Sequence, residues 1–181
     1  MPKAPSQKTK TTKTTKKSKK SKTTKKRQKT DIDMLAMVAE KQAREIIYKG
    51  VVTRIRHIYE LLEVPGRTEK MVTDAMTTII ELIGENKNCT NVVKVGLVAL
   101  SKITKNGYAI IGEANVISII LEGMALHITN VDVVHYALFL LAKVSKNEIG
   151  GDTIAAIGGI PTIVGVMTLH ITNVNVMGYA C

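Results

Sequence analysis

The chain has 181 residues and a formal net charge of +11, but the charge is unevenly distributed. Residues 1–30 hold 13 of the 26 Lys and Arg residues and no acidic residue, whereas residues 31–181 have a net charge of −2. The apolar residues are mainly aliphatic, with one Phe and no Trp, which favours packed helices over a β-sandwich or barrel. Two cysteines without paired spacing argue against a disulfide framework. No apolar stretch approaches the ~18–20 residues of a membrane-spanning helix, and none follows the basic start as a secretory signal requires.

The N-terminal segment, residues 1–30, consists mostly of Lys, Thr and Ser and is expected to be a disordered basic tail. Two clusters in it resemble monopartite nuclear localisation signals and equally suit a polyanion such as nucleic acid, the acidic tails of tubulin or anionic lipid. No aromatic residue interleaves the lysines, so such binding would depend on charge and salt rather than on base stacking. A solubilising tail without a dedicated partner is the alternative. The basic residues of the two clusters are Lys16, Lys17, Lys19, Lys20, Lys25, Lys26, Arg27 and Lys29.

Apolar residues recur at helical spacing from residue 31 onward, so residues 31–181 are expected to form one helical domain. The first four predicted helices are 32–48, 51–64, 68–85 and 91–105. Thr30 or Asp31 suits the N-cap of the first helix. Gly50 is expected to separate the first two helices, and Pro65 with Gly66 to end the second.

The second half of the chain repeats a unit of short, medium and long helix. Its predicted segments are a short helix or turn at 108–112, helices at 115–127 and 130–146, a turn at 153–157, a helix at 160–170 and a helix from 173. Gly150 and Gly151 are expected to form a loop. Pro161 suits the first turn of a helix, where its missing N–H has no partner to lose.

The hexapeptide Leu-His-Ile-Thr-Asn-Val occurs at residues 126–131 and again at 169–174, an offset of 43 residues. Identities continue at the same offset outside the hexapeptide. These pairs are Met124 and Met167, Ile120 and Ile163, Ile117 and Ile160, Tyr136 and Tyr179, and Ala137 and Ala180. A period of about 40–47 residues is typical of two- or three-helix solenoid repeats.

The repeat pattern resembles the armadillo family. The resemblance rests on Ala-Ile-Gly-Gly-Ile-Pro at 156–161, on the repeated hexapeptide, and on the third-helix segments 137–144 and 96–103. It is clear over about residues 91–181 and weak over 32–90, where a HEAT subtype remains open. It implies an all-α, right-handed solenoid of about three and a half repeats, the last incomplete. It also implies that the third helices line a concave surface that binds peptide segments.

The Trp and Asn ladder of the best-known armadillo proteins has no counterpart here, because Val98 with Lys102 and Phe139 with Lys143 stand at that spacing. The expected partner groove is instead made of two i, i+4 stripes on neighbouring helices. Lysines beside an apolar residue would suit an acidic or phosphorylated segment with an apolar anchor. Ordinary solvated lysines are the alternative interpretation. The groove residues are Lys94, Val98, Lys102, His135, Phe139 and Lys143.

No enzymatic grouping is recognisable in the sequence, so catalytic residues, cofactors and metal ligands are not expected. His127 and His170 recur with the repeat, which favours a structural role at a helix end over a ligand role. Cys89 lies in a polar turn. Gly158 and Gly159 are not followed by the Gly-Lys-Ser/Thr of a phosphate loop.

The resulting prediction is a non-catalytic protein-interaction scaffold of the cytoplasm, the nucleus or both, with the basic tail for polyanion anchoring or nuclear targeting. The alternative is a nucleic-acid- or microtubule-associated protein whose tail is the main binding element. The apolar residues of the last repeat are expected to be covered by more repeats, in a longer protein, or by another chain.

Overall fold

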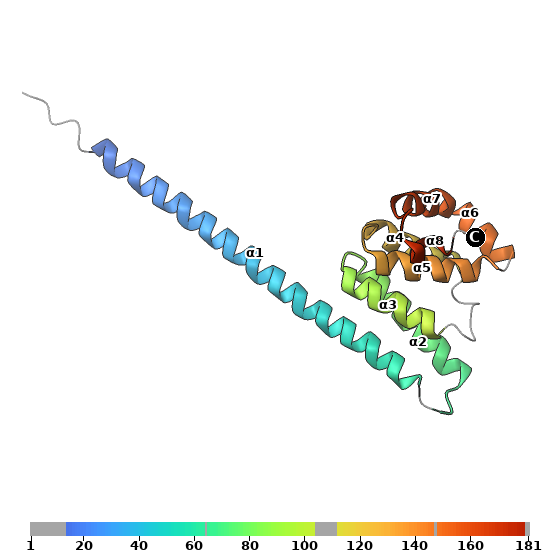
Figure 1. Ribbon diagram of the computed structural model, residues 1–181. Coiled ribbons are helices and arrows are strands. Elements are labelled where there is room, and N and C mark those ends of the chain that lie inside the picture. Colours follow the sequence, from blue (N-terminus) through green and yellow to red (C-terminus); the bar gives the residue numbers. More distant parts are fainter. Residues whose placement is uncertain (1–13, 64, 104–111, 147, 180–181) are drawn as a thin grey trace, which may run out of the picture. The chain divides into compact units, whose positions relative to one another are not determined.

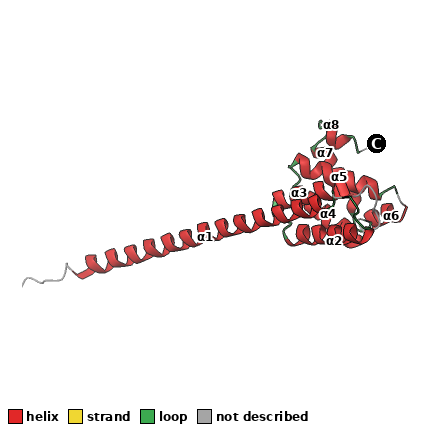
Figure 2. Ribbon diagram, turned by 90° about the horizontal axis from the view of Figure 1, so that it is seen from below, coloured by secondary structure: helices red, strands yellow, loops and turns green. Residues whose placement is uncertain are grey.

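The computed structural model describes the backbone of residues 14–63, 65–103, 112–146 and 148–179, and the side chains from residue 33 onward within those ranges. All the secondary structure in these ranges is helical, as Figure 2 shows, so the all-α prediction is confirmed. The helices are α1 (Thr14–Leu61), α2 (Glu69–Glu85), α3 (Thr90–Ile103), α4 (Ala114–Leu126), α5 (Val131–Val144), α6 (Glu148–Ala156), α7 (Gly159–Leu169) and α8 (Val174–Met177).

The helix α1 is continuous through Gly50, so the predicted division into two helices is wrong. A glycine in a helix costs only about 1 kcal/mol relative to alanine. Tyr48, Val51 and Val52 flank it and pack against the core, which offsets that cost. The helix also begins at Thr14, so Thr30 and Asp31 are not its N-cap.

Part of the segment expected to be disordered therefore lies in α1, from Thr14 to residue 30, while residues 1–13 are outside the described residues. Lys and Gln have good helix propensity, and a helix already formed extends at low cost because each added residue gains a hydrogen bond.

Asparagine and threonine side chains set the starts of three of the remaining helices. Thr68 accepts from the backbone N–H of Met71 at the start of α2, and Asn130 accepts from that of Val133 at the start of α5. Asn173 repeats the second arrangement at the start of α8. These are N-caps, which satisfy N–H groups that have no partner inside the helix. The boundaries predicted for α2, α4, α5 and α7 agree with the structure to within two residues.

The helix α6 begins earlier than the turn predicted at 153–157 and contains Gly150 and Gly151, so the loop predicted at these glycines is wrong. Gly150 is buried at the corner between α5 and α6. A Cβ added there would lie 2.4 Å from the carbonyl oxygen of Val144. The glycine is therefore required for close packing rather than for a turn. Most of the short helix or turn predicted at 108–112 falls outside the described residues.

The chain divides into two units, Met1–Glu45 and Ile46–Cys181. In the second unit α2 packs on α4 and α4 packs on α7, while α3 packs on α5 and α5 packs on α8 (Figure 1). Because α2 also packs on α3, and α4 on α5, these helices form two layers with an aliphatic core between them. Its largest fully buried side chains include Ile79, Ile83, Leu97, Leu100, Ile117, Ile120, Met124 and Leu140.

Candidate partner-binding surface

The helix α3 has one face in the core and one face toward solvent. Val92, Val93, Leu97 and Leu100 are fully buried at helical spacing. The stripe consequently lies on the other face of α3. Its residues follow one another at intervals of about one helical turn: Lys94, Val98 and Lys102. The three residues predicted as a stripe on α3 therefore share one face of the helix, and their side chains are at least partly exposed to solvent.

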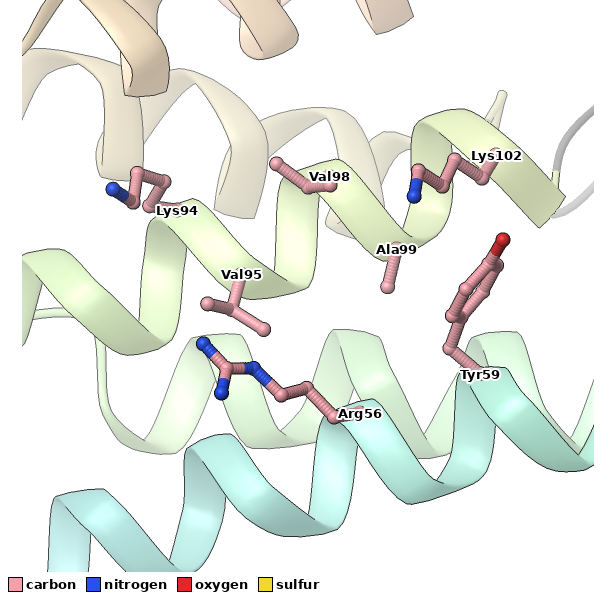
Figure 3. Close-up of a pocket in the computed structure, with 7 residues that line it drawn as sticks. All are labelled: Arg56, Tyr59, Lys94, Val95, Val98, Ala99 and Lys102. Carbon is pink, nitrogen blue, oxygen red and sulfur yellow. The ribbon is translucent and has the colours of Figure 1, made fainter.

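A pocket of ≈ 220 Å³ lies between α3 and the C-terminal part of α1 (Figure 3). The seven lining residues are Arg56, Tyr59, Lys94, Val95, Val98, Ala99 and Lys102. In the close-up, Val95 and Ala99 project from α3 toward α1, and the Tyr59 ring projects from α1 toward the end of α3 that bears Lys102. Aliphatic side chains and one aromatic ring thus form the walls, and three cationic side chains surround them.

The two lysines of the pocket are held at its ends. Lys102 places its Nζ 4.9 Å from the centre of the Tyr59 ring, a cation–π contact. Lys94 places its Nζ 3.4 Å from Oδ2 of Asp132 on α5. Because both groups of this ion pair are partly exposed, it adds little stability and leaves Lys94 available to a stronger anion.

Besides its ring contact with Lys102, Tyr59 makes a hydrogen bond through its hydroxyl group. Its hydroxyl donates a hydrogen bond to the Glu63 carboxylate one turn later. This hydrogen bond, together with the negative charge of Glu63, raises the pKa of Tyr59 above its ordinary value. The ring therefore stays neutral at physiological pH.

The second predicted stripe, on α5, is engaged by the end of the chain. His135 Nδ1 lies 3.2 Å from the backbone carbonyl oxygen of Asn175, and its Nε2 lies 3.5 Å from the Tyr179 hydroxyl. The Tyr179 ring meets those of His135 and Phe139 edge to face. Lys143 Nζ lies 5.5 Å from the centre of the Phe139 ring. Burial raises the pKa of Tyr179. The α5 stripe is therefore largely occupied by the chain's own residues.

Sequence reasoning missed four pocket residues: Val95 and Ala99 on α3, and Arg56 and Tyr59 on α1. The i, i+3 spacing of Arg56 and Tyr59 on the helix predicted before α2 was a usable signal, since it places both on one face. Which turn of α1 faces α3 depends on packing, and the sequence does not specify it. The side chains of the basic clusters, Lys16 to Lys29, lie outside those described, so their role stays a prediction.

Each of the two repeated histidines contacts a backbone carbonyl 40 or 42 residues earlier in the chain. His127 Nε2 donates to the carbonyl oxygen of Lys87 at 2.8 Å, and its Nδ1 lies 3.1 Å from Oγ1 of Thr90. His170 Nε2 donates to the carbonyl oxygen of Ile128 at 2.6 Å. Both histidines thus make the same kind of contact with an earlier segment of the chain, in keeping with a structural role for them.

Replacing His127 by alanine should lower the free energy of unfolding by about 1–3 kcal/mol, because the Lys87 carbonyl loses its donor in a partly buried place. Chemical denaturation followed by circular dichroism measures this loss. His57→Ala, at an exposed histidine of α1, is the matched control and should change stability by less than about 0.5 kcal/mol. Equal effects of the two substitutions would contradict the role given to His127.

Within the described ranges no three His, Cys, Asp or Glu side chains are grouped so that they could hold a metal ion. No single helix in the described part of the chain is long and apolar enough to cross a membrane, although α6 and α7, bent by 84° at their junction, pass that test as a pair.

No family model, no curated protein and no solved structure matches this chain.

Proposed function

We propose that the chain is a non-catalytic interaction scaffold, built as an armadillo-like solenoid, that binds an acidic or phosphorylated segment in the pocket between α1 and α3. The solenoid interpretation is supported by the 43-residue repeat and by the two layers in which each helix packs on its counterpart in the next unit. The histidine contacts between successive units support it independently.

One observation carries the binding proposal: three cations, Arg56, Lys94 and Lys102, surround a pocket with apolar walls. Guanidinium and ammonium groups select carboxylates or phosphates. The apolar walls have room for one aliphatic or aromatic side chain, which would bury its surface there. A segment with an apolar residue flanked by anionic ones satisfies both features.

Fluorescence anisotropy with labelled peptides tests the proposal on the full chain. A peptide with one leucine between glutamates should bind saturably, and the phosphoserine version should bind at least as well. Replacing its leucine by serine should weaken binding by roughly tenfold, since the apolar contact is lost. Equal binding of the leucine and serine peptides would contradict a role for the apolar walls.

The basic segment, residues 1–30, supports a second candidate function, the anchoring of the chain to a polyanion. Its 13 basic residues, without a single acidic one, predict binding that weakens steeply with salt.

Removing residues 1–30 should abolish salt-sensitive binding to duplex DNA or heparin while acidic peptides still bind the pocket. Binding measured between about 50 and 200 mM salt should fall by several orders of magnitude for the full chain. Unchanged polyanion affinity after the deletion would contradict the anchoring role.

A further inference from the structure

Three large apolar side chains on α1 are exposed and share one side of the helix: Met34, Leu35 and Val38, at 58%, 69% and 48%. Val38 lies three residues after Leu35 and four after Met34, so its side chain is beside both. We call these three residues the α1 apolar face. Every side chain described from 33 to 45 is exposed, so no described part of the chain covers this face. Neighbouring exposed apolar side chains mark an interaction surface.

The charged residues around the α1 apolar face are arranged by sign. Asp33 and Glu40 are seven residues apart and therefore share one side of the helix, and neither is three or four residues from any of the three apolar residues. Lys41 follows Val38 by three residues and Met34 by seven, so a cation borders the face. An apolar side bordered by a cation, with acids on the opposite side, is typical of a helix that lies on an anionic membrane surface.

The basic segment, residues 1–30, precedes the α1 apolar face in the same unit, Met1–Glu45. It supplies 13 Lys and Arg residues and no acidic residue. From Thr14 onward its backbone belongs to α1, so cations and apolar face are carried by one helix. At 1.5 Å per residue, the stretch from Lys16 to Val38 extends over about 33 Å.

The combination of charge and apolar surface distinguishes the candidate occupants. Nucleic acid and acidic protein tails offer anions to the lysines but no apolar phase to the adjacent face. A second copy aligned in parallel would bring two basic segments together, and their charges would repel. A groove in a partner protein would have to be acidic and then apolar over about 33 Å, the diameter of a small domain. An anionic bilayer has no such limit of length, and it offers anionic headgroups directly above an apolar interior.

We propose that α1 binds the surface of an anionic lipid membrane, with the basic segment at the headgroups and the α1 apolar face inserted at the boundary of the acyl chains. Charge alone or a small apolar anchor alone gives only marginal, reversible binding, so stable anchoring takes both. The inference rests on the polyanion anchoring proposed above and names the polyanion as lipid. It does not require the pocket.

Co-sedimentation of the full chain with phosphatidylcholine vesicles, with and without phosphatidylserine, tests the proposal. The chain should bind the vesicles that contain phosphatidylserine, and Leu35→Ser with Val38→Ser should weaken that binding by at least roughly tenfold, because the apolar contact is lost. Binding to duplex DNA should stay unchanged, because these substitutions leave every charge in place. The matched control is Leu126→Ser with Leu169→Ser, at two exposed leucines of other helices, and it should change neither kind of binding.

Tryptophan fluorescence reports insertion directly, because the chain contains no Trp. The emission of Leu35→Trp should shift to shorter wavelengths on phosphatidylserine vesicles, and lipids brominated on their acyl chains should quench it. Leu126→Trp, at an exposed leucine of α4, should show neither effect.

Vesicle binding that Leu35→Ser with Val38→Ser does not weaken would overturn the proposal and leave the anchoring to a polyanion in place. So would an emission of Leu35→Trp that stays that of an indole in water, or a lipid-free dimer that the serine pair dissociates. Equal binding to both kinds of vesicle would contradict the role of the basic segment. A chain that binds neither vesicles nor duplex DNA would overturn the anchoring itself.

Discussion

Reversing two charges of the pocket, Arg56→Glu with Lys102→Glu, should weaken binding of the glutamate–leucine peptide by roughly a hundredfold. Each substitution replaces a cation that attracts the peptide by an anion that repels it. We expect each to weaken binding by about tenfold, which is at the low end of the effects measured at close charge pairs. The measurement is the anisotropy titration, repeated at two salt concentrations.

The control for this experiment is Lys70→Glu, which changes the net charge as much as either pocket substitution alone, at an exposed lysine of α2 outside the pocket. It should weaken binding by less than about twofold. If Lys70→Glu weakens binding as much as Lys102→Glu does, the peptide senses the overall charge and the pocket is not its site. The pocket variants should keep the fold, because the contact of Lys102 with Tyr59 is worth only about 0.5–1 kcal/mol.

Replacing Gly150 by alanine should lower the free energy of unfolding by about 1–3 kcal/mol. The new methyl group would meet the backbone oxygen and a side-chain carbon of Val144 at 2.4 and 2.6 Å, so α6 must move. The backbone of Val144 cannot move aside as the end of a flexible side chain can. Thermal unfolding would show a fall of roughly 2–4 °C for each kcal/mol in a domain of this size.

Gly50→Ala is the matched substitution in an open place, since a Cβ there meets nothing within 4 Å. It should raise stability by about 0.5–1 kcal/mol through helix propensity and the loss of freedom in the unfolded chain. A destabilising Gly50→Ala would contradict the continuity of α1 through this residue, and a neutral Gly150→Ala would contradict the close packing of α6 on Val144.

The two glycines also show what could be predicted from sequence. Caps at Asn130 and Asn173 are local signals, so the helices that they start were predicted nearly correctly. Gly50 and Gly150 give the same local signal of a break, but packing overrides it in both places. At Gly50 the flanking residues pack on the core, and at Gly150 the missing side chain lets two helices approach.

The residues of the candidate site likewise fall into those that local spacing predicts and those that only packing brings together. Lys94, Val98 and Lys102 share a face because of helical spacing alone, so the sequence predicted this stripe. Arg56 and Tyr59 join it only through the packing of α1, which spacing does not specify. Spacing likewise predicted the stripe of His135 and Phe139, but not that Tyr179 would contact both.

The central claim is that an anionic segment binds in the pocket between α1 and α3, and amide chemical-shift mapping of the isotope-labelled full chain tests it most directly. With the glutamate–leucine peptide added, the largest shifts should fall on residues 56–59 and 94–102. Shifts confined to residues 1–30 or to α5 and α8, or no saturable shifts at all, would contradict the claim.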